Sequence, residues 1–288
     1  MEGGSILITG ATGTFGHAFV RAILGSYERI CIYSRGEHTQ AAMRESLEDH
    51  PSLRWFIGDV RDRDRLRRAM TGCQCVVHAA ALKRIEVGAY NPMEVVKTNV
   101  VGAMNVVEAA TDADVQRVVA LSTDKAWQPI GPYGYSKALA ESIFLAHHDA
   151  SGKHGPGMSV VRYGNVWGSA GSVVPRWRQL IAQGHTSVPV TDPDCTRFFM
   201  RVQTAVDIVR GALQRPEGGE LIVPTDLPVY RLGDLAEAFG VQMRITGLPS
   251  HEKLHEGMLD GLTSDKARRM TLAHLRGEID GHQPVSSR

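Results

Sequence analysis

The stretch Thr9-Gly10-Ala11-Thr12-Gly13-Thr14-Phe15-Gly16 decides the fold of this chain. It follows an apolar run at residues 5–9 and opens a segment at 13–24 whose apolar residues are spaced three and four apart, a pattern that predicts strand, tight turn and helix. Glycines at such a turn let the backbone approach a pyrophosphate closely, and the exposed amides at the start of the helix hold the anion. The stretch therefore predicts a dinucleotide site, although a bare strand-to-helix turn also uses glycine.

Short runs rich in β-branched residues alternate with longer helical patterns through the first half of the chain. The predicted strands are residues 5–9, 29–33, 53–58, 75–79, 117–122 and 158–163, and the predicted helices are 13–24, 62–70, 92–110 and 133–148. This alternation predicts an α/β fold with a doubly wound parallel sheet of the Rossmann type. After Tyr163 the pattern is less regular, and turns rich in Gly and Pro predict substrate-contacting loops around 168–175, 189–193 and 216–219.

Charge and composition exclude several classes of protein. The 288 residues are 43% hydrophobic and carry 32 basic and 31 acidic side chains, so no overall field would gather nucleic acid or an anionic membrane. The first four residues lack a secretory signal and no segment approaches the ~20 apolar residues of a membrane span, so we expect a cytoplasmic location. The cysteines have neither disulfide-framework nor metal-site spacing, so we expect reduced thiols and no metal; they are Cys31, Cys73, Cys75 and Cys195.

The ends of the second and third predicted strands bear on the choice of cofactor. Ser34-Arg35 stands where an acidic residue would hydrogen-bond the ribose of NAD, and a guanidinium there suits a 2′-phosphate. This favours NADP over NAD. Asp59-Val60 is placed to contact the adenine, and a helix cap is an equally open interpretation for Asp59.

Tyr133 and Lys137 lie four residues apart at the start of a predicted helix, which puts both on one face. Making a free tyrosine, with a pKa near 10, ionise near neutrality needs ~4 kcal/mol of selective stabilisation, which a neighbouring ammonium and an oxidised nicotinamide could share. Tyr135, two residues from Lys137, would point away from the helix face that Tyr133 and Lys137 share. A packed tyrosine beside a surface lysine is the default alternative, but the strand ending at Ser122-Thr123 supplies a hydroxyl for the same substrate oxygen.

An acid and a base, Asp124 and Lys125, directly follow that hydroxyl. At the end of a sheet strand, where ligands of α/β folds bind, such a pair indicates more than carbonyl reduction. The alternative is a surface ion pair.

These motifs together resemble the UDP-N-acetylglucosamine 4,6-dehydratases, extended short-chain dehydrogenase/reductases, and especially their small soluble 5-inverting type. The most specific string is Ser122-Thr123-Asp124-Lys125-Ala126. The similar stretches run in order along most of the chain, at residues 9–16, 78–83, 91–99, 121–126, 133–137, 161–166, 171–175, 191–198 and 252–256. Retention of Tyr133 separates the chain from the large membrane-bound relatives.

The resemblance implies a mechanism and a set of residues. Tyr133, supported by Thr123 and Lys137, would take the proton of the sugar 4-hydroxyl while hydride passes from C4 to NADP. Lys125 would remove the C5 proton and Asp124 would protonate the departing 6-hydroxyl before hydride returns to C6, with reprotonation deciding whether C5 inverts.

The implied cofactor-binding residues are Gly10, Thr12, Gly13, Thr14, Phe15, Gly16, Ser34, Arg35, Asp59, Val60, Ala79, Ala80, Ala81, Lys83, Asn99, Tyr133 and Lys137. The implied substrate-binding residues are Lys83, Asn165, Val173, Arg197 and Glu256, with Arg197 as a diphosphate ligand. Asn99 would help to hold the active-site backbone or a water. Relatives of this type associate through helices that flank the sheet, so we expect a homo-oligomer.

Two departures leave the substrate open. Ala170 and Leu248 stand where the family usually has arginines, so we expect a weaker grip on a diphosphate or a different preferred ligand. The open alternatives are the same chemistry on another nucleoside or nucleotide-linked substrate, in polysaccharide or specialised-metabolite biosynthesis, and a simple epimerase or ketoreductase. A non-catalytic NADP-binding sensor would leave Asp124 and Lys125 without a role.

We expect residues 1–164, with returns around 198–225, to form the NADP-binding domain and residues 165–288 to be mainly a substrate-binding region interleaved with it.

Overall fold

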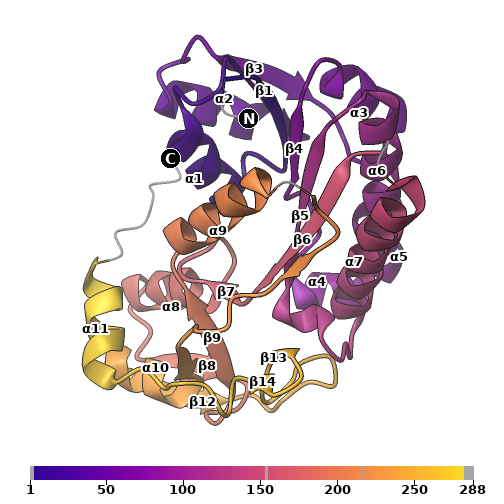
Figure 1. Ribbon diagram of the computed structural model, residues 1–288. Helices are drawn as coiled ribbons and strands as arrows, with labels where there is room; N and C mark the ends of the chain where they lie inside the picture. Colours follow the sequence, from indigo (N-terminus) through magenta and orange to yellow (C-terminus); the bar gives the residue numbers. More distant parts are fainter. Residues whose placement is uncertain (1–2, 153–154, 216, 282–288) are drawn as a thin grey trace.

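The computed structural model describes residues 3–152, 155–215 and 217–281, and a parallel sheet forms their centre (Figure 1). Seven strands of the described residues are ordered β10-β6-β5-β4-β1-β2-β3, and each is parallel to its neighbours. They are β1 (Ser5–Thr9), β2 (Arg29–Ser34), β3 (Leu53–Ile57), β4 (Cys75–His78), β5 (Arg117–Thr123), β6 (Gly157–Tyr163) and β10 (Leu221–Ile222). The prediction of a doubly wound parallel sheet is confirmed. The strand order reverses between β1 and β4, which is where ligands bind in such sheets.

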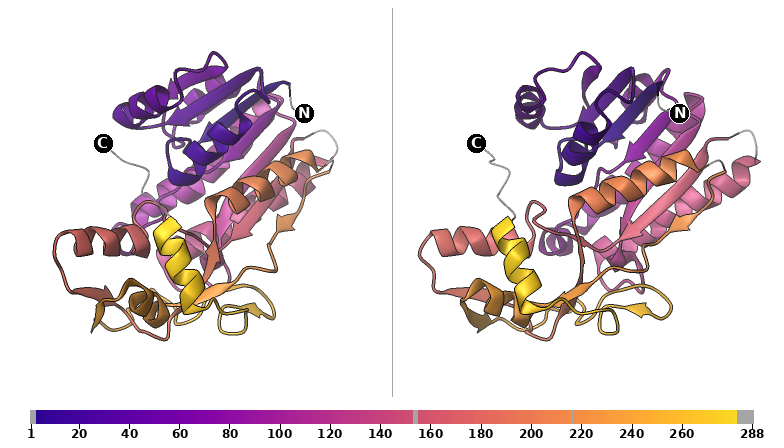
Figure 2. Two further views of the ribbon diagram at one scale, coloured as in Figure 1. Left: turned by 90° about the vertical axis from the view of Figure 1, so that its left-hand side faces the viewer. Right: turned by 60° about the vertical axis from the view of Figure 1, so that its left-hand side comes forward.

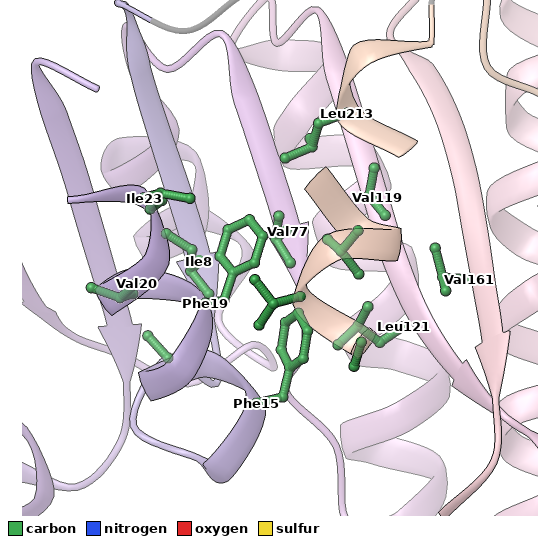
Figure 3. Close-up of a cluster of buried hydrophobic side chains, with 14 of the residues drawn as sticks. Ile8, Phe15, Phe19, Val20, Ile23, Val77, Val119, Leu121, Val161 and Leu213 are labelled. Carbon is green, nitrogen blue, oxygen red and sulfur yellow. The ribbon is translucent and has the colours of Figure 1, made fainter. Parts of the chain in front are cut away.

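Helices cover both faces of the sheet (Figures 1 and 2). One face packs against α1 (Thr14–Ile23), α2 (Glu37–Ser46) and α9 (Val202–Gln214), and the other packs against α3 (Arg63–Met70), α6 (Gly102–Asp112) and α7 (Pro132–Ser151). On the first face, the rings of Phe15 and Phe19 stack at 5.5 Å and lie against the apolar side chains of the sheet (Figure 3). Burying each ring contributes about 2–3 kcal/mol, and this packing holds the start of α1 at the end of β1.

The helix predicted at residues 92–110 is divided in the structure. It consists of α5 (Pro92–Val95), a π-helical segment η1 (Val96–Val101) and α6. A π-turn bonds each amide one residue further back than an α-turn, so it changes which side chains face the sheet. The apolar spacing of the sequence does not reveal this change. The predicted helix at 133–148 is present as the longer α7.

The second half of the chain builds a smaller lobe next to the sheet (Figure 2). Its strands are β7 (Asn165–Val166), β8 (Ser187–Val190), β9 (Thr196–Met200), β11 (Val229–Arg231), β12 (Gln242–Ile245), β13 (Gly257–Leu259) and β14 (Leu262–Thr263), and its helices are α8 (Val173–Ala182), α10 (Leu232–Phe239) and α11 (Leu272–Gly281). Trp167 packs 5.1 Å from Phe199 and 5.7 Å from Tyr230 in a separate core. Since β7 follows β6 almost directly, the lobe begins at the carboxyl end of the sheet.

No helix in the described parts of the chain has the length and apolar character needed to cross a bilayer.

Candidate active site

Two adjoining cavities lie at the carboxyl ends of the strands. The first, of about 800 Å³, is lined by the glycine turn and the ends of β2, β4 and β5, and we call it the cofactor cavity. The second, of about 950 Å³, is lined by α8 and the loops of the smaller lobe, and we call it the substrate cavity. Lys83, Val166, Ser169 and Ala170 line both, so the two spaces share a wall.

The glycine turn needs its glycines for steric reasons. Gly10 has a φ of +67°, and a Cβ there would lie 2.7 Å from the backbone nitrogen of Ala80. A Cβ at Gly16 would lie 2.5 Å from the Cα of Ala11, so only glycine lets α1 start this close to the turn. The N-cap of α1 is Gly13, which has no side chain to bond the first amides of the helix. Those amides point into the site and can hold an anion.

Arg35 follows β2 at the rim of the cofactor cavity, and its side chain is 56% exposed. Its guanidinium lies 3.8 Å from the carboxylate of Asp59, which Arg61 binds more closely at 2.7 Å. Burial opposes ionisation of Asp59, but the hydrogen bonds and charge of Arg61, with the charge of Arg35, hold its pKa below the usual value. The closer pairing with Arg61 means that Asp59 does not depend on Arg35 for charge compensation.

The predicted cofactor-binding residues line the cofactor cavity, except for Asn99. Asn99 lies buried on η1, where its amide group accepts from the nitrogen of Leu82 at 2.8 Å and donates to the carbonyl of Leu82 at 3.0 Å. It also donates to the hydroxyl of Ser136 at 3.0 Å. Asn99 therefore anchors the loop that carries Lys83.

Thr123, Tyr133 and Lys137 line the same end of the cofactor cavity. The ammonium of Lys137 donates to the carbonyl of Leu121 at 2.6 Å, and burial lowers its pKa to about 8, although Glu141 opposes this shift. Burial also raises the pKa of Tyr133 to about 12, a rise that the charge of Lys125 and a hydrogen bond with Thr123 reduce.

Tyr135 is 59% exposed and lines none of these cavities, in contrast to Tyr133.

Asp124 is fully buried and the side chain of Lys125 is 16% exposed, so their pair in η2 (Asp124–Ala126) is not a surface ion pair. Lys125 lines the substrate cavity, and Asp124 lines neither cavity. The Thr123 hydroxyl donates to Asp124 Oδ1 at 2.9 Å, and Lys125 Nζ donates to the same oxygen at 3.0 Å. Lys125 Nζ also donates to Asn165 Oδ1 at 3.2 Å and lies 3.3 Å from Glu256 Oε1.

The pKa values of Asp124 and Lys125 are both raised, but for different physical reasons. Burial raises the pKa of Asp124 even though the charge of Lys125 opposes the rise. Burial disfavours the ammonium of Lys125, but the carboxylates of Asp124 and Glu256 outweigh burial and raise its pKa. Burial therefore shifts Asp124 towards its protonated form, whereas the neighbouring carboxylates shift Lys125 towards its ammonium form.

Lys83, Asn165, Val173 and Arg197 line the substrate cavity. Glu256 does not, because it lies behind Lys125. Arg197 is buried and aimed by Glu252, whose carboxylate lies 2.9 Å away.

Of the two departures from the family, Ala170 lines both cavities, and its backbone N–H donates to the Thr14 hydroxyl at 3.0 Å. Leu248 lines neither cavity, whereas Pro249 and His251, a few residues on, line the substrate cavity.

Sequence reasoning missed Arg84 and Arg176, which also line the substrate cavity. Arg84 precedes α4 (Ile85–Tyr90), and Arg176 lies in the first turn of α8. The only sequence signal for Arg84 was its place next to Lys83.

The sheet order and the glycine turn define the class of Rossmann-type α/β folds, a fold that similar solved structures share. Within that class, the chain belongs to the family described as polysaccharide biosynthesis protein, whose model matches residues 6–275.

It is similar to a UDP-N-acetylglucosamine 4,6-dehydratase (inverting) of Campylobacter jejuni subsp. jejuni serotype O:23/36, with 41% identity over 99% of this chain and 83% of the relative. A UDP-glucose 4-epimerase of Rickettsia akari is 38% identical over 91% of this chain and 80% of its own. The X-ray structure of Pen from Bacillus thuringiensis superimposes with a TM-score of 0.92 at 29% identity, covering 98% of this chain and 99% of the other. The resemblance inferred from the motifs is confirmed.

Proposed function

We propose that this protein is an NADP-dependent 4,6-dehydratase of a nucleotide sugar similar to UDP-N-acetylglucosamine. The observation that carries the proposal is the ion pair of Asp124 with Lys125 beside Thr123, because Lys125 lines the substrate cavity while Thr123 and Tyr133 line the cofactor cavity. Dehydration needs an acid and a base on neighbouring carbons, and this pair supplies both. The relative of Campylobacter jejuni, which carries this activity in its name, supports the same conclusion.

The cofactor cavity fits a dinucleotide. The uncapped start of α1 and the close approach at Gly10 suit a pyrophosphate, and Arg35 at the rim suits a 2′-phosphate. When bound, the oxidised dinucleotide supplies a positive charge beside Tyr133 and a temporary acceptor for the hydride of C4. The proton transfers are carried out by side chains of the protein itself.

Tyr133 removes the proton of the sugar 4-hydroxyl, with Thr123 as hydrogen-bond partner and Lys137 as the nearby cation. A pKa of about 12 means that forming the phenolate at pH 7 needs about 7 kcal/mol at 1.36 kcal/mol per unit. The site therefore ionises Tyr133 only when positive charge is placed next to it, which restricts oxidation to the loaded enzyme.

Asp124 protonates the departing 6-hydroxyl and Lys125 removes the C5 proton. The raised pKa of Asp124 favours the protonated form that a proton donor needs. An epimerase, the activity named for the Rickettsia relative, needs Tyr133 and Lys137 but has no use for a buried acid and base beside them.

Mass spectrometry of UDP-N-acetylglucosamine incubated with the protein and NADP in deuterated water tests the proposal. Loss of one water with deuterium at C5 is the expected result. A product of unchanged mass with inverted C4 would instead show an epimerase. No reaction in a sample that binds NADP would direct the search to nucleoside or monophosphate ligands, for which the missing arginine at Ala170 matters less.

Two structural proposals accompany the activity. Residues 1–164 together with α9 and β10 would form the NADP-binding domain, and residues 165–288 would otherwise bind substrate. The second is a homo-oligomer, supported by large apolar side chains that are exposed on the adjoining helices α4, α5 and α7, namely Val87, Tyr90, Met93, Tyr135 and Leu139.

A further inference from the structure

The substrate cavity carries an excess of positive charge. The cationic side chains that line it are Lys83, Arg84, Lys125, Arg176 and Arg197. The ion pairs with neighbouring carboxylates compensate Lys125 and Arg197. Among the described residues that line the cavity, the remaining three cations face only one further carboxylate, that of Glu86. Such an excess attracts an anionic ligand, which indicates a substrate that carries phosphate.

The guanidinium of Arg84 lies against the loop in which the family's arginine is missing. A Cβ built on Gly171 would lie 3.2 Å from Nε of Arg84 and 3.7 Å from its Cζ and Nη2. Gly171 has a φ of +76°, so the loop conformation favours glycine, and the missing side chain leaves room for the guanidinium. The bond from Ala170 to the Thr14 hydroxyl ties this loop to the start of α1. Arg84 therefore places a cation beside the residue that follows position 170.

The protein itself holds the Arg84 side chain only weakly. The side chain is 59% exposed, and its Nε lies 3.9 Å from Oε1 of Glu86, which is long for an ion pair. The described residues offer its guanidinium no hydrogen bond. An exposed ion pair of this length contributes little to stability. The donors of Arg84 are therefore available to a ligand, and replacing the residue should leave folding intact.

Further donors lie on the same side of the cavity, at the start of α8. Ser172 is the N-cap of this helix, and its side chain makes no capping bond. Its hydroxyl is buried and has no partner in the described parts of the chain. Ser172 and Val173 line the substrate cavity together with Arg84 and Gly171. The free hydroxyl and the first amides of α8 can bind the same anion as a guanidinium placed next to Gly171.

We propose that Arg84 binds the diphosphate of the substrate and takes the place of the arginine that is missing at position 170. This inference rests on the proposed function and deepens it, because it assigns the substrate to the nucleoside diphosphate sugars. The planar guanidinium donates two parallel hydrogen bonds to phosphate oxygens between the loop at 168–172 and the start of α8. A diphosphate balances the charge of the cavity better than a monophosphate or an uncharged nucleoside does.

The test measures binding by isothermal titration calorimetry, with saturating NADP present to fill the cofactor cavity. UDP, dTDP, GDP and CDP are titrated into the wild type, and the diphosphate that binds most tightly is compared with its monophosphate. We expect the diphosphate to bind about tenfold more tightly. Equal affinities, or no binding of any of the four diphosphates, would overturn the proposal.

The same diphosphate is then titrated into variants. Arg84→Gln should raise its Kd by about tenfold or more, because a charge-assisted bidentate contact is lost. Arg84→Lys should recover part of the affinity, since it keeps the charge but not the planar fork. Arg276→Gln is the matched control, at an exposed arginine on α11 that lines neither cavity, and its Kd should equal that of the wild type. An unchanged Kd in Arg84→Gln would remove Arg84 from the phosphate site.

A double-mutant cycle tests whether Arg84 takes the place of the missing arginine. If both positions serve one diphosphate, Ala170→Arg should improve binding more in the Arg84→Gln background than in the wild type, where Arg84 already binds the anion. Strictly additive effects would show that the two guanidiniums do not share an anion, and the replacement would be refuted.

Turnover separates this inference from the proposed function. If diphosphate binding depends on Arg84 but no water is lost from UDP-N-acetylglucosamine, the dehydratase function fails and the role of Arg84 stands. If the wild type dehydrates the sugar, we expect Arg84→Gln to raise the KM by about tenfold with kcat little changed, since the contact exists before the reaction begins. Dehydration by Arg84→Gln with the KM of the wild type would leave the function intact and overturn the role of Arg84.

Discussion

Replacing Lys137 by methionine should make the protein more stable at neutral pH while abolishing its activity. Lys137 is 5% exposed, its ammonium has the carbonyl of Leu121 as acceptor, and the nearby carboxylate of Glu141 is already bound by Arg162. Burial lowers the Lys137 pKa from 10.5 to about 8. At 1.36 kcal/mol per unit, holding the ammonium in the folded protein at pH 7 costs about 3 kcal/mol.

The substitution has an opposing cost. Methionine has a similar length and is apolar, but it leaves the Leu121 carbonyl without its donor, which costs about 1–2 kcal/mol. We therefore expect a net gain of about 1–2 kcal/mol in the free energy of unfolding at pH 7.

The pH dependence identifies the cause. The unfolded chain keeps the Lys137 proton up to about pH 10.5 and the folded protein only up to about pH 8, so between these values the unfolded state binds more protons. The wild type therefore gains stability relative to Lys137→Met as the pH rises through this window, and the advantage of the variant shrinks.

Urea unfolding of the protein without cofactor, followed by circular dichroism at pH 7 and pH 10, measures both effects. Lys266→Met, at an exposed lysine, is the control for loss of a charge. A variant less stable than the wild type at pH 7, or an advantage that does not shrink at pH 10, would refute the reasoning.

Three further substitutions test the site. Lys125→Ala should abolish dehydration and still permit C4 oxidation, visible as the absorbance of reduced nicotinamide; full product formation by this variant would contradict its role as the C5 base. Ala170→Arg should lower the KM for a UDP-sugar by about tenfold with kcat little changed, because a bidentate guanidinium contact to phosphate is worth about 1.5–3 kcal/mol; an unchanged KM would mean that position 170 does not reach the diphosphate. Arg35→Asp should shift the ratio of kcat/KM from NADP towards NAD by about tenfold or more, and an unaltered ratio would remove Arg35 from the cofactor site.

The structure bears out the strand predictions because their signals are local. Residues 5–9 were predicted as a strand and are β1, and each of the other five predicted strands agrees with the structure to within one residue at either end. A strand buried on both faces appears in the sequence as a short apolar run. The glycine turn is likewise recognised from residues that are adjacent in the chain. The helix α2 gave no such signal, since only Gln40 and Met43 of its ten residues are buried.

The sequence by itself determined the sheet, the glycine turn and the identity of Thr123, Asp124, Lys125, Tyr133 and Lys137 as a cluster, because these features depend on residues close together in the chain. Tertiary structure alone decided what surrounds the cluster. Glu256 reaches Lys125 from a segment 131 positions later in the chain only because β13 packs against η2, and the burial of that contact sets the protonation of both groups. Spacing along the chain does not encode the distance between such segments, nor the desolvation that follows from their packing.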